Sequence, residues 1–434
     1  MKNRLLIIIL AGLSMLGAFS TDTYLPSFPS IAAEFQVGLD VVQQTLTVYL
    51  LAMAVMTLFH GTLSDAVGRR PVILGGLALY LAASIGAYFA GSFSLLLLCR
   101  LVQGMSAGVG MVVGRAMIRD RFSGPEAQTV MSYTTVVFGL APVLAPILGG
   151  WLEVVLGWRS VFGFLSIFGF LLLVACGLKL PESLPLAKRS PLHLRATLKD
   201  YATVGSDPRF LLQSLAIALA ASALFIYISA APVFVLKILR LSETSFAWLF
   251  IPMITGIMAG SLAAGRVASF WRPERTIRIG FFIMVGAAVV NALYSAFFTA
   301  AIPWALIPIM LCTFGMAFVS PAMTILTLDL YPSRRGLAAS LQSAFVMGVF
   351  SICAGLVVPL LFGSALKLAC GVLTGYLASV ALWVYGQKRS LRRGNQPAPS
   401  DQKAQMPQQS THPPGEPLKA LNAIRKPGLA EASG

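Results

Sequence analysis

Long runs without charged side chains are the feature that most limits how this chain can fold. Ten windows contain no Asp, Glu, Lys or Arg, apart from one aspartate in the first window. An α-helix needs about 20 consecutive, mostly apolar residues to cross the hydrocarbon layer of a membrane. Two of the windows are long enough for more than one such helix, so the chain has room for twelve. The windows are 5–28, 41–64, 71–99, 127–152, 160–178, 210–236, 244–265, 279–328, 336–366 and 368–387.

Windows 71–99 and 279–328 have to be divided. Window 71–99 holds a third helix and the start of a fourth, which continues past Arg100. Window 279–328 holds two helices, and Pro303 supplies a turn between them near residues 301–304. Only 11% of the residues are charged, against roughly a quarter in a soluble chain. We therefore expect an all-α integral membrane protein with twelve transmembrane helices.

Several other classes fit the sequence poorly. Lys2 and Arg4 before an apolar run resemble a signal peptide, but the run continues past Ser20 and eleven further spans follow, which favours an uncleaved helix. The cysteines are odd in number, lie inside apolar windows and show no CxxC spacing, so no disulfide framework, no metal site and no cofactor are expected. They are Cys99, Cys176, Cys312, Cys353 and Cys370.

Basic residues mark one side of the predicted helices. Arginines and lysines fall in the N-terminal segment, in the loops on that same side and in the tail, so the positive-inside rule puts both termini in the cytoplasm. The net charge of +16 is spread over these loops and not gathered on one face, so no nucleic-acid partner is expected. The basic residues on the opposite side are Arg159, Lys237, Arg240 and Lys367.

The sequence also contains an internal repeat. DTYLPSF (22–28) is matched about 200 residues later by YISAAPVF (227–234), and GTLSDAVGR (61–69) is matched by GSLAAGR (260–266). Two six-helix pseudo-repeats explain both matches, and such repeats are typical of secondary transporters, whose substrate site lies between the halves. The predicted divisions are an N-terminal half at 1–180, a cytoplasmic loop at 181–207, a C-terminal half at 208–387 and a disordered cytoplasmic tail at 388–434.

One carboxylate lies inside the first window. In residues 5–33 the only ionisable side chain is Asp22, and a carboxylate in lipid costs about 2.5–3.5 kcal/mol or more. If the first helix ends near Phe28, Asp22 lies about 9 Å below the outer surface. If the fourth helix starts near Phe93, Arg100 lies about 10 Å below the same surface. The two charges are therefore expected at one level.

Ionisable residues inside a membrane are functional by default, so we interpret Asp22 and Arg100 as a coupling pair for protons and substrate, joined directly or through water. Gln103, three residues after Arg100, shares its helix face and adds a polar contact. A structural salt bridge without a role in transport is the alternative. Weaker candidates for the lining of a central cavity are Tyr24, Tyr227 and Asn291.

The loop GTLSDAVGRRPV (61–72) joins the second and third predicted helices. A basic loop that only sets orientation would explain its arginines but neither Asp65 nor the glycine spacing. We expect a gate here, in which Arg69 pairs with Asp120 and Asp65 is attracted to the positive N-terminal end of the eleventh helix, near Arg335. The predicted gating residues are Gly61, Asp65, Gly68, Arg69, Arg70 and Asp120.

The fifth predicted helix contains LAPVLAPILGGWL (140–152). Glycines and prolines make a helix deformable and let a neighbour approach closely, so a seam between the halves is expected at this helix. Packing without function explains any single glycine equally well. The residues concerned are Gly139, Pro142, Pro146, Gly149 and Gly150.

GTLSDAVGRRPV resembles the signature loop of the major facilitator superfamily, and the resemblance extends over all twelve spans. Three further stretches together resemble the Bcr/CflA branch of proton-coupled drug exporters. They are STDTYLPSFP, CRLVQGMSAGVGMVVGRAMIRD and LAPVLAPILGGWL. The resemblance implies the major facilitator fold and a proton-coupled antiporter that exports drug-like molecules from bacteria across the inner membrane. The same stretches are also similar to those of a purine-nucleoside exporter within that branch.

The resemblance implies a small-molecule substrate, protons and the lipid bilayer as partners, and we expect a monomer. An uncoupled facilitator or channel is the rival, but no predicted helix shows the continuous polar stripe of a channel. GMSAG (104–108) also matches the GxSxG motif of hydrolases. No strand precedes Ser106, and the only histidine in a span is His60, so we expect no catalytic residues and interpret Gly104 and Gly108 as a packing face.

Overall fold

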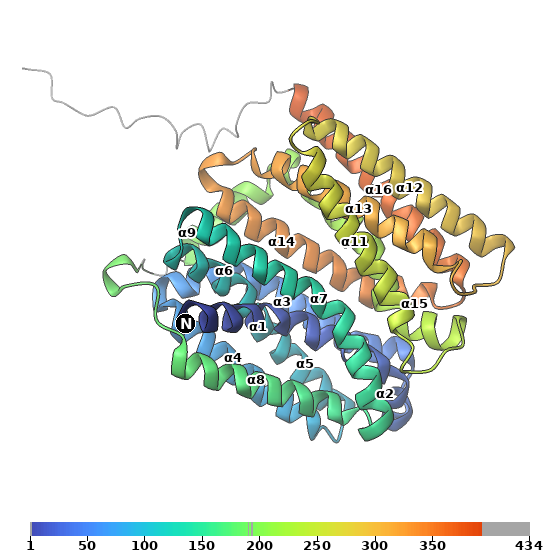
Figure 1. The fold of residues 1–434 in the computed structure, drawn as a ribbon, viewed down its shortest axis with the longest axis horizontal. Coiled ribbons are helices and arrows are strands. Elements are labelled where there is room, and N and C mark those ends of the chain that lie inside the picture. The colour runs from blue at the N-terminus through green and yellow to red at the C-terminus, as the bar shows by residue number, and fades with distance from the viewer. Residues whose placement is uncertain (1, 190, 192–193, 393–434) are drawn as a thin grey trace, which may run out of the picture.

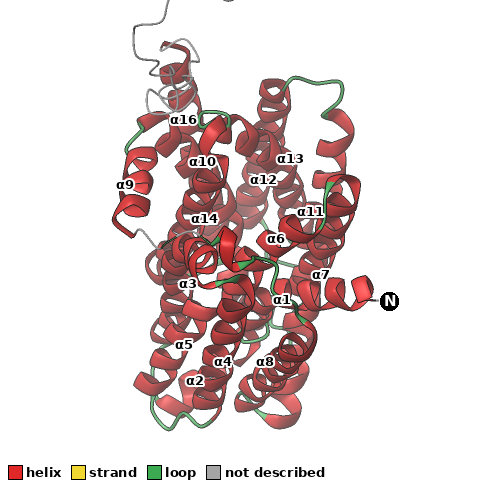
Figure 2. Ribbon diagram, turned by 90° about the vertical axis from the view of Figure 1, so that its left-hand side faces the viewer, coloured by secondary structure: helices red, strands yellow, loops and turns green. Residues whose placement is uncertain are grey.

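The computed structural model describes residues 2–189, 191 and 194–392, and the account below concerns these residues (Figure 1). They form helices and loops, and no β-strand occurs among them (Figure 2). Twelve segments of the described chain are long and apolar enough to cross a membrane. The prediction of a twelve-span, all-α membrane protein is confirmed. Most of the predicted tail, from residue 393 onward, lies outside the described residues.

The first six spans are built from eight α-helices and one short 3-10 helix. These are α1 (Lys2–Asp22), η1 (Leu25–Ser27), α2 (Phe28–Phe35), α3 (Leu39–Val67), α4 (Arg69–Tyr88), α5 (Phe93–Ala107), α6 (Val109–Arg121), α7 (Gly124–Leu156) and α8 (Arg159–Lys179).

The remaining six spans follow after a connecting segment that contains two helices, η2 (Leu186–Lys188) and α9 (Leu194–Gly205). The spans comprise α10 (Pro208–Ser229), η3 (Val233–Ile238), α11 (Ala247–Val267), α12 (Pro273–Phe297), α13 (Leu306–Leu328), η4 (Pro332–Arg334), α14 (Arg335–Ile352), η5 (Cys353–Val357), α15 (Val358–Leu361) and α16 (Ala365–Arg392).

Each group of six spans packs mainly on itself. In the first group α1 packs on α7, and α4 packs on α5 and α8; in the second, α10 packs on α16, and α13 packs on α11 and α12. The groups meet where α3 lies along α14 and α7 along α11, between the blue-green and yellow-orange parts of Figure 1. The helix breaks repeat as well, because η1 follows α1 and the π-helical η3 follows α10.

The bundle has two ends. Because the number of spans is even, Lys2 and Arg392 lie at one end, which we call the terminal end. The opposite end, where Phe35 and Leu156 lie, is called the distal end. The first span differs from the prediction, because regular helix stops at Asp22 and the span continues through η1 and α2 to Phe35 instead of ending near Phe28.

Helix α9 was not expected within the connecting segment, and it bridges the two groups. Tyr201 Oη donates a hydrogen bond to the Leu58 carbonyl of α3 (3.0 Å), and Asp200 accepts one from Arg334 Nη1 of η4 (2.8 Å). Val204 packs in a small buried cluster with residues at the starts of α10 and α14. The segment therefore carries an ordered link between the groups.

Candidate functional site

Asp22 is the last residue of α1, and its side chain is buried. Only 5% of the residue is exposed, and Thr21 Oγ1 donates a hydrogen bond of 2.9 Å to Asp22 Oδ1. Asp22 takes part in none of the ion pairs within the described part of the chain. The carboxylate thus lies at a helix break inside a predicted span, without a basic partner to compensate its charge.

Arg100 of α5 is fully buried beside α1. Its Nη1 donates hydrogen bonds to the Ser20 carbonyl (3.0 Å) and to Gln103 Oε1 (2.9 Å). Its guanidinium carbon lies 4.7 Å from the ring centre of Tyr24 and 4.4 Å from that of Tyr49. Aromatic faces attract a desolvated cation. Arg100 therefore lies beside the end of α1 and contacts Gln103, as expected. Its guanidinium lies against two aromatic rings and not against Asp22.

The polar contacts of Arg100 continue through neighbouring side chains to α4, within the first group of spans. Gln103 Nε2 donates to Ser84 Oγ of α4 at 2.8 Å, and the hydroxyls of Ser20 and Tyr80 lie 2.6 Å apart. All four side chains are fully buried. Sequence reasoning missed Tyr49, Ser84 and Tyr80, because nothing in the local sequence shows that a tyrosine or serine faces an arginine on another helix.

Two of the candidate cavity residues lie inside the second group of spans. Asn291 Nδ2 donates a hydrogen bond of 2.8 Å to Tyr227 Oη, and each residue is 2% exposed. Tyr24 is fully buried, and its hydroxyl lies 3.1 Å from Thr45 Oγ1. The structure thus joins Tyr227 to Asn291, and a role of these three residues in lining a cavity stays a prediction.

The charged loop between α3 and α4 forms a compact network. Arg69 pairs with Asp65 (2.5 Å) and, as expected, with Asp120 (3.0 Å). Gly68 has a φ of +115°, a backbone conformation that strongly favours glycine, and its neighbour begins α4. Glu182 accepts hydrogen bonds from the backbone N–H groups of Arg69 (3.0 Å) and Arg70 (3.2 Å). Glu182 therefore stabilises the start of α4, where a negative charge is favoured.

A cavity of about 350 Å³ separates this loop from the second group of spans at the terminal end. Asp65 and Arg119 line it on one side, and Asp200, Gly336 and Ser340 line it on the other. Asp65 thus faces the start of α14 across open space. The predicted attraction between Asp65 and that helix end stays a prediction for a conformation in which this cavity is closed.

The two groups are joined tightly at the distal end. Gln43 Nε2 of α3 donates to Ser229 Oγ of α10, and Gln44 Nε2 donates to the Gly355 carbonyl at 3.2 Å. Ser351 Oγ donates to the Thr47 carbonyl at 2.9 Å. Three polar contacts therefore join α3 to the second group near the distal end, where a cavity of about 440 Å³, lined by Asp40 and Lys237, also lies between the groups.

The last glycines of α7 permit very close contacts. A Cβ on Gly149 would lie 2.0 Å from the Thr23 carbonyl oxygen, and a Cβ on Gly150 would lie 2.0 Å from the Glu243 carbonyl oxygen. Gly139 has open space around it, while Pro142 and Pro146 lie inside the helix. Gly149 and Gly150 thus bring α7 against the backbone of both groups.

Gly104 of α5 makes a comparable contact, because its Cβ would lie 2.2 Å from the Tyr49 carbonyl oxygen of α3. Ser106 Oγ donates to carbonyls of its own helix, at Val102 and Gln103, both at 3.0 Å. The surroundings of GMSAG are therefore those of a helix-packing face, as predicted.

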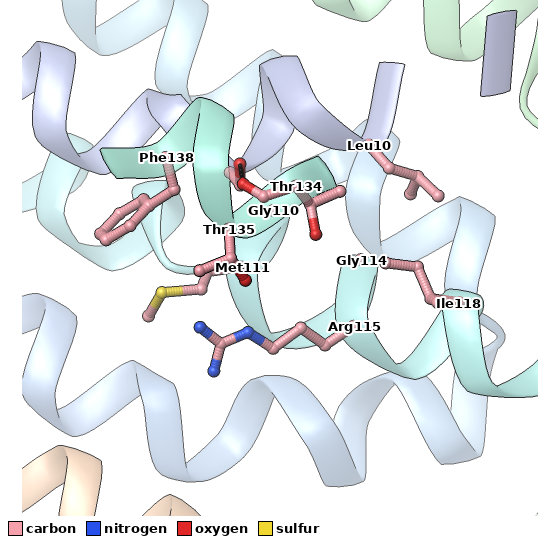
Figure 3. A pocket seen from close by; sticks show the side chains of 10 residues that line it. Leu10, Gly110, Met111, Gly114, Arg115, Ile118, Thr134, Thr135 and Phe138 are labelled. Atoms are coloured by element: carbon pink, nitrogen blue, oxygen red, sulfur yellow. Dashed lines mark hydrogen bonds between the residues drawn. The ribbon is translucent and has the colours of Figure 1, made fainter. Parts of the chain in front are cut away.

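A small cavity of about 30 Å³ lies between α1, α6 and α7. Figure 3 shows the Arg115 side chain reaching past Met111 and Thr135 within it. Its volume suits a group the size of a water molecule. This cavity is therefore too small to hold an organic substrate in the present conformation.

Comparison with known proteins places the chain in a family. Residues 10–358 match the model of the Major Facilitator Superfamily. The chain belongs to this superfamily. An uncharacterized MFS-type transporter of Bacillus subtilis, YdgK, is 31% identical over 366 residues, which cover 83% of this chain and 89% of YdgK.

Two further comparisons concern function and fold. The chloramphenicol resistance protein of Pseudomonas aeruginosa is 26% identical over 312 residues, covering 72% of this chain and 73% of that protein. The crystal structure of a D-xylose–proton symporter superimposes with a TM-score of 0.67 at 15% identity, covering 87% of this chain and 97% of the symporter. The fold is therefore that of a multi-pass major-facilitator transporter, and the relatives include a drug-resistance protein.

Proposed function

We propose that this transporter is a proton-coupled antiporter that exports small organic molecules, such as drugs, across the inner membrane of a bacterium. The observation that carries the proposal is Asp22, a buried carboxylate at a helix break within a span and without a basic partner among the described residues. An uncompensated carboxylate inside a membrane is costly and is typical of a proton-relay residue. The chloramphenicol-resistance relative supports a drug-like substrate.

In this proposal Asp22 carries the coupling proton, and Arg100 with Gln103 holds the adjoining end of α1 through the Ser20 carbonyl. One proton moving inward down 100 mV and one pH unit supplies about 2.3 plus about 1.4 kcal/mol. That free energy would sustain a gradient of roughly several hundredfold in a neutral substrate. One proton per cycle would therefore be sufficient to drive export against a gradient of that size.

The distribution of basic residues supports an orientation with both termini in the cytoplasm. The terminal end then faces the cytoplasm, and the distal end faces outward. The conformation described here, joined at the distal end, would be the one that loads substrate from inside the cell. We propose that a monomer carries out the whole cycle, because the two groups that meet at the distal end and face each other across the terminal-end cavity belong to one chain.

A transport assay tests the proposal directly. Proteoliposomes that contain the purified protein are given a pH gradient and a panel of chloramphenicol-like drugs and purine nucleosides. We expect accumulation of at least one drug against its gradient, and we expect a protonophore to abolish it. Accumulation of nucleosides alone would indicate a metabolite exporter. Equilibration without accumulation would indicate an uncoupled facilitator and would contradict the proposal.

Asp65→Asn is expected to slow transport about fivefold while protein abundance stays normal. The substitution weakens the contact with Arg69 and removes the charge that faces α14 across the cavity, so closure of the terminal end loses a favourable term of about 1 kcal/mol. Initial rates at equal expression measure the effect. Glu274→Gln, which changes an acid in the first turn of α12, is the matched control. A wild-type rate for Asp65→Asn would exclude the gating role.

Gly150→Val is expected to shift the protein toward conformations that are open at the distal end. A side chain at this position overlaps the Glu243 carbonyl, so the closed distal end can form only after a backbone shift. Labelling of a Ser229→Cys variant from the distal side, compared with and without Gly150→Val in a background that lacks the native cysteines, measures the opening. Gly139→Val is the control, because Gly139 has open space around it. Unchanged labelling in Gly150→Val would show that this contact does not maintain the closure.

A further inference from the structure

A stripe of hydroxyl groups continues from Asp22 toward the distal end. Thr23 follows the end of α1, Ser27 ends the 3-10 helix η1 and Ser30 lies in α2, so the three hydroxyls lie along the break in the first span. Thr23 and Ser27 are fully buried, and neither Thr23 Oγ1 nor Ser27 Oγ has a hydrogen-bond partner among the described residues. Buried hydroxyls without a protein partner are typical binding sites for internal water.

Helix α7 packs against this stripe. Gly149 touches the backbone of Thr23, and Glu153, one helical turn further along α7, accepts a hydrogen bond at Oε1 from Ser30 Oγ. The intervening Ser27 belongs to η1, which packs on α7. The stripe therefore begins beside Asp22 and ends at the Glu153 carboxylate, with bare backbone at Gly149 along its side.

Glu153 is unusual for its position near the end of α7. It is 9% exposed, although the next residue, Val154, is 58% exposed, and its Oε2 is buried without a partner in the described part of the chain. At this end of the bundle Arg159 is already paired with Glu34, at 2.7 Å. Glu243, which faces Gly150, approaches α7 through its backbone. No cation in the described structure therefore compensates Glu153.

We propose that Glu153 is a second proton-binding carboxylate, which receives protons at the distal end and passes them along Ser27 and Thr23 to Asp22. A proton taken up at Glu153 Oε2 moves through water molecules and hydroxyls, each of which accepts one proton and donates one. It ends on a carboxylate oxygen of Asp22, and Glu153 returns to its ionised form. The relay rests on the proposed proton-coupled function and adds the route by which protons reach the coupling residue.

Glu153→Gln tests the relay, because it keeps the size of the side chain but cannot cycle between acid and base. In proteoliposomes we expect transport driven by a pH gradient to fall about 100-fold, the scale for loss of a positioned proton-transfer group. Exchange of labelled for unlabelled substrate at uniform pH needs no net proton movement and should keep its rate. Glu34→Gln, the same change at the same end, is the control and should retain both rates.

The outcomes separate the relay from the proposed function. Wild-type protein without proton-driven transport overturns both. Coupled transport in the wild type and an equal coupled rate in Glu153→Gln overturn the relay alone. If Glu153→Gln does not fold, Thr23→Val replaces it, with Ser166→Ala as a hydroxyl control whose Oγ donates to its own helix. Thr23→Val is then expected to slow coupled transport and not exchange, and equal losses of both rates would overturn the relay.

Discussion

Asp22→Asn is expected to abolish transport of substrate against its gradient, while the protein still inserts and folds. The amide keeps the oxygen that accepts the hydrogen bond from Thr21, so the local structure at the end of α1 is preserved. It cannot bind and release a proton, so a neutral substrate should only equilibrate, and the gradient of roughly several hundredfold that one proton can sustain should disappear. Substrate accumulation in proteoliposomes at several external pH values measures both effects.

The control for this experiment is Asp40→Asn. Asp40 lies in the first turn of α3 at the distal end and is exposed, so the same chemical change there should leave accumulation and its pH profile intact. Melting temperatures of both purified variants should stay near that of the wild type. A well-folded Asp22→Asn protein that still concentrates substrate with the original pH profile would show that the proton is carried elsewhere.

Arg100→Ala is expected to destabilise the protein by about 3 kcal/mol or more and to abolish transport. The substitution removes two charge-assisted hydrogen bonds and two contacts with aromatic faces, each worth about 1–3 kcal/mol in a desolvated site. Arg100→Lys should restore little, because a compact ammonium group lacks the planar group that lies over both rings and reaches Ser20 and Gln103 together. Thermal unfolding in detergent and transport rates test both variants.

Tyr49→Phe provides the matched control for the aromatic contact. It keeps the ring face that lies 4.4 Å from the Arg100 guanidinium and loses the polar contacts of the hydroxyl, with the Gly17 carbonyl at 3.3 Å and with the Ser20 side chain. We expect near-normal stability for Tyr49→Phe and a clear loss for Tyr49→Leu. Wild-type activity in Arg100→Lys would show that the charge alone matters and that the aromatic faces do not.

The sequence predicted those features that depend on periodicity within one segment. The apolar windows predicted twelve spans because each span needs an uninterrupted apolar length, which is visible in the sequence. The contact between Arg100 and Gln103 followed from their spacing of three residues on one helix. The pair of Arg69 with Asp120 followed from the position of both residues at the same end of their predicted helices. In each case the necessary information was the length of an apolar segment, the spacing of two residues or the position of a residue along its predicted helix.

The remaining features depend on which helices meet. Tyr49 lies 51 residues before Arg100, and Glu182 lies 113 residues after Arg69, so no local pattern joins these partners. Asp22 and Arg100 were expected to pair directly or through water because their depths match, and the described residues show no direct pair, because depth does not determine the direction of a side chain around its helix. The break after Asp22 shifted the end of the first span from Phe28 to Phe35. These features required the packed structure.

The contacts of Gly149 and Gly150 limit how this transporter can evolve. Neighbouring positions on α7 press bare backbone against Thr23 on one side and Glu243 on the other. The smallest available change, one methyl group, already exceeds the free space, so no graded series of substitutions exists there. Sequence change at the distal end is therefore expected at other positions first, because any side chain at these two requires the backbone of a neighbouring segment to move.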